Sequence, residues 1–286
     1  MIRLMLTACC VLALGVDAVA ERPGRARYDQ CMNKAMGSPD AGINMALAWQ
    51  ADGGGVPARH CEAVGLYELG EYAESAVRLE SLVEDMRTGK DMPLVDGRRV
   101  TATGRALADM LGQAANAWLM ASEIVRAYQA IGQALSLVES GTALHRSLLV
   151  DQGRIHAADG DMEAAYDTLK EALDGMRKDT PALALLASAA RQTGRLNEAA
   201  DILSRYRDAF PERVDGLLEL GNLRRAQDRL AEARRAFVRV IQQAPDSEEA
   251  EIARRTIEVM DLDLPKEEAA GQVDPEAPAP DQPDPD

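Results

Sequence analysis

Residues 183–211 read LALLASAARQTGRLNEAADILSRYRDAFP, and residues 217–245 read LLELGNLRRAQDRLAEARRAFVRVIQQAP. The two stretches share one order of features, in which small residues alternate with large apolar ones and a proline closes each stretch. Gly221 follows Ala187 by 34 residues, and Pro245 follows Pro211 by the same interval. A self-similarity at this fixed period predicts a repeat architecture, because each period builds one supersecondary unit.

Each stretch predicts two amphipathic helices. Leu217, Leu220 and Gly221 recur at helical spacing on one face, and Ala233 and Phe237 do the same on a second helix. The small residues allow the two helices to approach closely, and the closing proline cannot continue the second helix. One such hairpin cannot bury its apolar face alone, so successive hairpins are expected to stack.

The 34-residue pattern resembles the tetratricopeptide repeat (TPR) family, over residues 56–247. This resemblance implies an all-α fold, a right-handed α-solenoid of helix-turn-helix hairpins. We expect an N-terminal helical cap, an inserted segment after the first repeat, and a C-terminal capping helix whose exposed face is charged. The predicted division is cap 21–55, TPR 1 at 56–87, insertion 88–107, TPR 2 at 108–141, TPR 3 at 146–179, TPR 4 at 180–213, TPR 5 at 214–247 and capping helix 248–262.

The two ends of the sequence predict no repeat. Residues 1–20 resemble an export signal, with Arg3, an apolar run and an A-x-A cleavage site at 18–20. The alternative is the lipobox-like run 6–9, in which Cys9 would carry a lipid anchor. Residues 263–286 are acidic and rich in proline, and they cannot bury enough apolar surface to fold, so a disordered tail is predicted. The periplasm of a bacterium is therefore the expected location.

Cys31 and Cys61 are the only cysteines after the predicted cleavage site. In an oxidising compartment a lone pair usually forms a disulfide, which here would staple the N-terminal cap to the first repeat. The alternatives are a redox-active pair, or metal ligation together with His60. The spacing lacks C-x-x-C, and adjacent residues 60 and 61 point to different faces of a helix, so the disulfide is preferred.

The sequence carries no motif of a known catalytic or nucleotide-binding site. It contains no G-x-S-x-G elbow, no P-loop and no H-E-x-x-H. Asp159, Gly160 and Asp161 lack the ligand spacing of a calcium loop and predict a turn between two helices. The net charge of −15 is opposite to that of a nucleic-acid-binding surface. We expect no enzyme activity, cofactor, metal, nucleic acid or membrane insertion after signal cleavage.

In the TPR family the first helix of each repeat lines a concave groove that binds a peptide or a partner helix. The groove positions of the family can be matched to residues of this sequence. Among the matched residues, those whose side chains best suit peptide binding are Tyr67, Asn116, Arg154, Arg191, Asn222 and Arg225. The same positions also hold His60, Val64, Leu119, Met120, Ser188, Gln192 and Leu218.

Three of these residues are arginines, one in each of three successive repeats, although the protein is acidic. Guanidinium groups favour carboxylates, so the groove is expected to bind an acidic segment or the C-terminus of a polypeptide. The alternative is that the arginines only keep the surface soluble. The overall expectation is a monomeric, non-catalytic interaction scaffold. The rival hypotheses are a lipid-anchored assembly factor at the outer membrane and a thiol- or metal-dependent enzyme.

Overall fold

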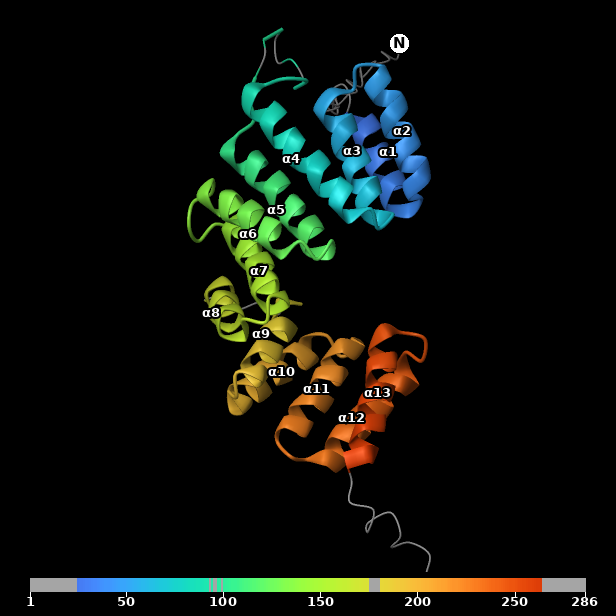
Figure 1. Ribbon diagram of the computed structural model, residues 1–286, viewed down its shortest axis with the longest axis vertical. Helices are drawn as coiled ribbons and strands as arrows, with labels where there is room; N and C mark the ends of the chain where they lie inside the picture. The colour runs from blue at the N-terminus through green and yellow to red at the C-terminus, as the bar shows by residue number, and fades with distance from the viewer. Residues whose placement is uncertain (1–24, 93, 95–96, 99, 175–180, 264–286) are drawn as a thin grey trace, which may run out of the picture. The chain divides into compact units, whose positions relative to one another are not determined.

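The computed structural model describes residues 25–92, 94, 97–98, 100–174 and 181–263 (Figure 1). These described residues form thirteen α-helices and no β-strand. The protein divides into two compact units, Met1–Thr101 and Ala102–Asp286. The predicted signal peptide and nearly all of the predicted tail lie outside the described residues.

The first unit contains four helices: α1 (Arg25–Gly37), α2 (Pro39–Ala51), α3 (Gly55–Glu68) and α4 (Tyr72–Thr88). Its core joins α1, α2 and α3 through the buried residues Cys31, Ala35, Ala46, Trp49, Ala58 and Cys61. Gly42 allows α1 and α2 to approach closely, since an added Cβ there would lie 2.9 Å from the Cβ of Ala35. A larger side chain at Gly42 would therefore force α1 and α2 apart.

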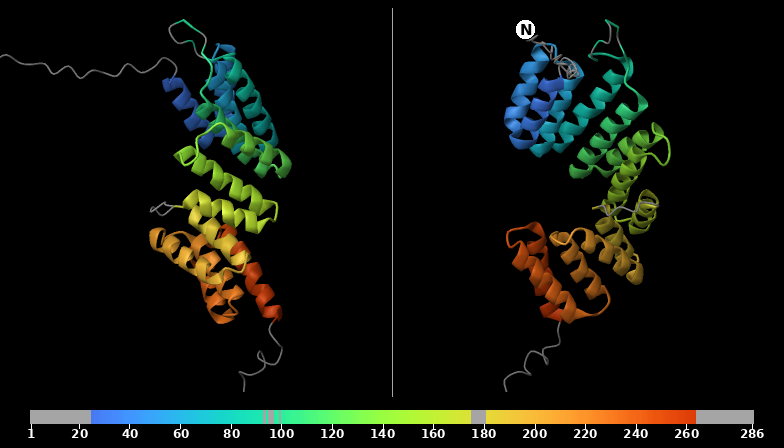
Figure 2. Two further views of the ribbon diagram at one scale, coloured as in Figure 1. Left: turned by 90° about the vertical axis from the view of Figure 1, so that its left-hand side faces the viewer. Right: turned by 180° about the vertical axis from the view of Figure 1, so that it is seen from behind.

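The second unit is a run of helical hairpins followed by one more helix (Figures 1 and 2). Its helices are α5 (Gly104–Met120), α6 (Ile124–Ser136), α7 (Ala143–Ala158), α8 (Met162–Leu173), α9 (Ala182–Gln192), α10 (Leu196–Ala209), α11 (Val214–Ala226), α12 (Leu230–Gln243) and α13 (Glu248–Asp263). The odd-numbered helices, here called the first helices, contact one another in succession from α5 to α13. The even-numbered second helices each pack against the first helices before and after them.

Helix α5 begins at Gly104 and not at Ala108, so it takes up the end of the predicted insertion. The hydroxyl of Thr103 accepts a hydrogen bond from the backbone N–H of Ala106 at 3.3 Å and caps the helix. This cap satisfies one of the N–H groups that the first turn of a helix leaves unpaired.

The turn inside each hairpin needs one residue in the left-handed region. Gly160, Gly194 and Asp228 occupy this place with φ angles of 85°, 79° and 58°. Glycine adopts that conformation without a steric penalty, and aspartate tolerates it better than most residues. The predicted turn at 159–161 is therefore confirmed, and Asp161 also caps α8 by accepting from the backbone N–H of Ala164 at 3.0 Å.

Within the hairpins a small residue faces a large one, as the repeat pattern predicts. An added Cβ at Gly221 would lie 2.6 Å from Cδ1 of the fully buried Phe237 ring. At Gly153 it would lie 2.6 Å from Cγ of Leu169. Helix α12 ends at Gln243, ahead of Pro245, because proline cannot continue it.

Helix α13 covers the end of the hairpin stack but is not uniformly charged on its exposed face. Ala250, Ala253 and Met260 pack against the cluster around Phe237. On its outer side Ile252, Val259 and Leu262 are 37%, 48% and 84% exposed. The expectation of a charged outer face is wrong in this respect, and apolar surface is available beside the last hairpin.

Candidate peptide-binding groove

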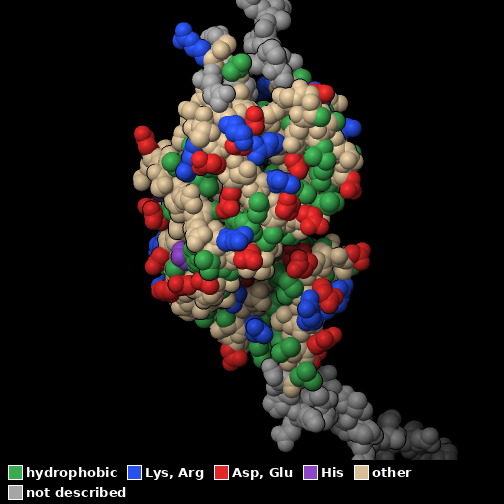
Figure 3. All heavy atoms as spheres, turned by 45° about the horizontal axis from the view of Figure 1, so that its top comes forward, with side chains coloured by type: hydrophobic (Ala, Val, Ile, Leu, Met, Phe, Trp, Pro, Cys, Tyr) green, Lys and Arg blue, Asp and Glu red, His purple; other side chains and the backbone are tan. Residues whose placement is uncertain are grey.

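The candidate groove of the second unit is the surface shared by the first helices. Two polar contacts join successive first helices directly, one between α5 and α7 and one between α9 and α11. Both contacts bridge first helices without involving a second helix. On the face of the molecule in Figure 3, basic and acidic side chains are interspersed.

Asp151 lies at the α5–α7 contact. Its carboxylate accepts a hydrogen bond from Nη1 of Arg154 at 2.9 Å and another from the side chain of Asn116. Burial raises the pKa of the Asp151 carboxyl, and the two donors oppose that rise. The predicted groove residues Asn116 and Arg154 therefore meet at one partly buried acid, which pairs with the charge of the exposed Arg154 side chain.

Arg191 lies at the α9–α11 contact. Its Nε donates to Oε1 of Glu219 at 2.6 Å, and its Nη2 donates to the hydroxyl of Ser188 at 3.3 Å. The two charged side chains are only 18% and 11% exposed. Removing either partner would leave an uncompensated buried charge, so this pair acts as a link between repeats.

Arg225 is different, because it is exposed and forms no ion pair with any described residue. It lines a hollow of about 230 Å³ between α11 and α13, with Ile252, Arg255, Thr256 and Val259 as the other lining residues. The Arg255 side chain is 66% exposed, and its Nε lies 3.5 Å from Oε1 of Glu251, which is also exposed. The hollow thus joins two accessible guanidinium groups to the exposed apolar side of α13.

Asn222 lies three residues before Arg225 on α11 and is half-buried. Its side-chain amide forms no hydrogen bond with any described residue. An amide at this place can pair with the backbone of an extended ligand.

The predicted candidates of the first unit are positioned by its own core. Tyr67 is half-buried and packs edge-to-face on Tyr72 across the α3–α4 turn, with ring centroids 5.2 Å apart. His60 is 7% exposed, and its Nδ1 lies 2.6 Å from the hydroxyl of Tyr28 on α1. The expectation that His60 faces a groove is wrong, because α1 covers it.

The remaining groove positions vary in exposure. Met120 is 50% exposed, and Gln192 donates to the Ser188 hydroxyl at 3.4 Å. Half-buried positions are Val64, Leu119, Ser188 and Leu218.

Sequence reasoning missed the acids that pair with the arginines. Asp151 precedes Arg154 by three residues on one helix, a spacing that indicates contact. Glu219 gives no such signal, because its partner is on another repeat. Arg255 and the apolar residues of α13 were also missed, since they lie beyond the matched repeats.

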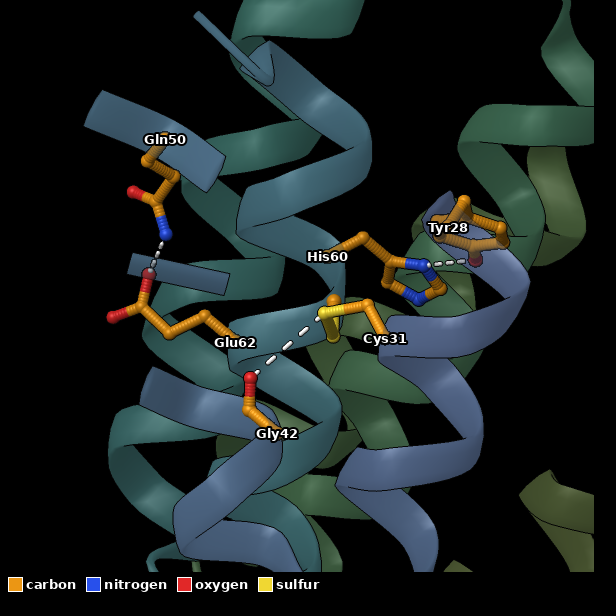
Figure 4. Close-up of a disulfide and its surroundings, with 7 residues drawn as sticks. Tyr28, Cys31, Gly42, Gln50, His60 and Glu62 are labelled. Atoms are coloured by element: carbon orange, nitrogen blue, oxygen red, sulfur yellow. Dashed lines mark hydrogen bonds between the residues drawn. A yellow bond between two sulfur atoms is a disulfide. The ribbon is translucent and has the colours of Figure 1, made fainter. Parts of the chain in front are cut away.

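The disulfide lies in the first unit (Figure 4). Cys31 of α1 and Cys61 of α3 are bonded, with their Cα atoms 6.1 Å apart, and neither residue is exposed. The predicted pairing is confirmed. It uses both thiols that the thiol-enzyme and metal-site hypotheses required. Over the part of the protein that the structure describes, no group of three or more His, Cys, Asp or Glu residues is placed to hold a metal ion.

Two family models match the sequence, both described as tetratricopeptide repeats, at residues 156–220 and 215–247. Residues 156–247 of the protein therefore carry tetratricopeptide repeats. Over 117 residues it is 33% identical to the protein CTR9 homolog of Arabidopsis thaliana, a match that covers 41% of this sequence and 10% of that protein.

Solved structures support the same fold. The protein resembles the structure reported in a functional characterization of Pseudomonas aeruginosa pilF, with a TM-score of 0.57 and 12% identity, covering 81% of this protein and 98% of the other. It also resembles the C-terminal part of a TPR repeat-containing protein from Cytophaga hutchinsonii, with a TM-score of 0.55 and 13% identity over 87% and 99% of the two proteins.

The family and the fold together define the class of protein. TPR arrays are protein–protein interaction scaffolds and are generally non-catalytic. No helix among the described residues is both long and apolar enough to cross a membrane.

Proposed function

We propose that this protein is a monomeric, non-catalytic scaffold of the bacterial periplasm, and that its first helices bind an acidic segment or the C-terminus of a partner protein. The observation that carries the proposal is the hollow between α11 and α13. There Arg225 is exposed and forms no ion pair with any described residue, beside Arg255 and the apolar side chains of Ile252 and Val259.

This combination suits a short peptide better than it suits an ion. Guanidinium forks bind carboxylates through paired N–H groups, and the apolar residues of α13 contact the neighbouring side chains of the ligand. Asn222 offers an amide to the ligand backbone. Arg191 links two first helices through Glu219, whereas Arg154 pairs with Asp151 within α7. Both arginines therefore contribute less charge to a ligand than the sequence alone suggested.

The binding test uses fluorescein-labelled peptides of alternating glutamate and leucine, measured by fluorescence anisotropy. We expect the glutamate peptide to bind more tightly than a matched lysine–leucine peptide. A C-terminally amidated version separates the two ligand types, because only recognition of a free C-terminal carboxylate loses affinity on amidation.

The variant that tests the hollow is Arg225→Glu with Arg255→Glu, which is expected to weaken glutamate-peptide binding by at least about tenfold. Arg191 is left unchanged, since its reversal would place two carboxylates together and report on folding. The matched control is Arg205→Glu with Arg235→Glu, on exposed positions of α10 and α12, with the same net charge. An equal loss in the control would mean that only net charge matters.

The location is a separate part of the proposal and rests on residues 1–20. The intact mass of the mature protein tests it. A mature protein that begins at Glu21 supports a periplasmic location, whereas one that begins at a lipidated Cys9 supports the outer-membrane assembly factor. Gel filtration with light scattering tests the monomer.

A further inference from the structure

A pocket beside the last hairpins is lined by arginines. Its volume is about 210 Å³, and it lies among α10, the α10–α11 loop, α11 and α12. The lining residues are Ser204, Arg207, Asp208, Phe210, Pro211, Arg213, Leu217 and Arg239. The residues of this pocket, here called the arginine pocket, are distinct from the lining of the α11–α13 hollow.

Two arginines of this pocket lack the partners that nearby arginines have. Arg213 pairs with Asp215 at 2.6 Å, and Arg224 pairs with Glu232 at 3.3 Å. Neither Arg207 nor Arg239 forms an ion pair or a side-chain hydrogen bond with any described residue. In a protein with a net charge of −15, two unpaired arginines that line one pocket are unexpected.

Arg207 is half-buried, and it lies close enough to Arg239 for the two charges to repel. Burial and the Arg239 guanidinium lower the pKa of Arg207, with Arg224 adding to the effect, while Asp208 opposes it. Asp208 is the one carboxylate among the lining residues. An anion between the two guanidinium groups would remove the repulsion and satisfy their donors.

The wall of the pocket is fixed by local structure. The hydroxyl of Tyr206 donates to Asp215 at 2.8 Å, and Asp215 also accepts the ion pair from Arg213. Phe210 packs on Tyr206, with ring centroids 5.2 Å apart. The loop that carries Phe210, Pro211 and Arg213 is therefore held against α10, and the pocket exists before a ligand arrives.

The lining also has an apolar part, made by Phe210, Pro211 and Leu217. Inorganic phosphate would gain nothing from these side chains, whereas a carboxylate on an aliphatic stem would contact them while its oxygens reach the arginines. The hydroxyl of Ser204 adds one more donor.

We propose that the arginine pocket is a second binding site, which takes a single carboxylate on an aliphatic stem, such as a glutamate side chain of a partner protein. The proposal rests on the proposed function only for the origin of that side chain. The pocket and its unpaired arginines are independent of the first helices.

The test observes the arginine Nε–Hε signals of the full-length protein by NMR during titration with N-acetylglutamate. We expect the signals of Arg207 and Arg239 to shift together and to saturate, with those of Arg205 and Arg235 unmoved. The neutral analogue N-acetylglutamine is expected to cause no shift. Parallel titration with inorganic phosphate compares the two anions, and N-acetylglutamate is expected to bind more tightly.

The variant Arg207→Gln with Arg239→Gln is expected to weaken N-acetylglutamate binding by at least about tenfold, observed through the remaining signals of the pocket wall such as that of Arg213. Its melting temperature should stay the same or rise, because the substitutions remove a repulsion. Arg205→Gln with Arg235→Gln on the same two helices should leave binding unchanged.

Three results would each overturn the proposal: no saturable shift of Arg207 and Arg239, tighter binding of phosphate than of N-acetylglutamate, or equal losses in the two double variants. None of them bears on the proposed peptide site of the first helices. That site is tested separately, by the effect of Arg225→Glu with Arg255→Glu on the anisotropy of a labelled peptide. Failure of the peptide experiment would in turn leave these NMR shifts in place.

Discussion

The disulfide offers the sharpest test of how the N-terminal helices are held. Replacing Cys31 and Cys61 by alanine removes a covalent link between α1 and α3 across a sequence separation of 30 residues. In the chain-entropy model, opening a loop of that length lowers the free energy of unfolding by about 3–4 kcal/mol. Alanine keeps the buried positions apolar and removes only the sulfur atom. The cavity that it leaves therefore lowers the free energy of unfolding by only a small further amount.

The two tryptophans allow each unit to be followed separately. Trp49 is 7% exposed in the core that surrounds the disulfide, and Trp118 lies in the second unit. In a Trp118→Phe background, urea unfolding monitored by Trp49 fluorescence should shift to a lower midpoint by roughly 1–3 M in the double-alanine variant. Chemical reduction of the wild-type bridge should produce a shift of similar size.

The control is the reverse background, Trp49→Phe, in which Trp118 reports on the second unit. Its transition should not move when the bridge is removed. Coincident Trp49 transitions for oxidised and reduced protein, with both thiols shown free by mass, would refute the reasoning. Equal movement of Trp118 would instead show that the stabilisation is not local to the first unit.

Two further predictions concern the second unit. Gly221→Ala should destabilise it by about 1–3 kcal/mol, because the new Cβ would overlap the Phe237 ring. Gly132→Ala in α6, where an added Cβ would have no atom within 4 Å, should instead stabilise it by up to about 1 kcal/mol. Equal melting temperatures of the two variants would contradict the packing argument. Burial and the hydrogen bond to Asp215 raise the pKa of Tyr206 from 10.0 to about 12. A raised folded-state pKa gives stability that is full below about pH 10 and is lost as the pH rises through about 12, so Tyr206→Phe should show a smaller alkaline fall in melting temperature, and an unchanged fall would count against the assignment.

The repeat pattern predicted most of the second unit because its signals are local. The pairing of Gly221 with Phe237 follows from helical spacing within one hairpin, and the helix stop before Pro245 follows from the chemistry of one residue. The start of α5 was placed too late, because it depends on a single cap at Thr103 with no periodic signal.

The candidate site was less predictable, because its chemistry depends on pairs. Sequence matching placed Arg154 and Arg191 on the first helices, but it did not show that Asp151 and Glu219 neutralise them. Glu219 comes from the next repeat, and only the stacking of α9 on α11 brings it to Arg191. The burial of His60 has the same origin, since its partner Tyr28 belongs to a helix outside the matched repeats.

Whether an arginine is already paired with a carboxylate of the protein therefore says more about binding than the presence of the arginine does. A paired arginine such as Arg191 already satisfies a carboxylate, and an incoming ligand would have to displace Glu219 from a contact that is mostly buried. An unpaired arginine offers its charge without that cost. Arg105 and Arg146 also form no ion pair with a described residue, but Arg207, Arg225 and Arg239 are unpaired in this sense and in addition line a pocket or hollow, and all three lie from α10 onward. Acidic ligands should for this reason engage the last hairpins and α13, while the earlier first helices supply shape and hydrogen bonds.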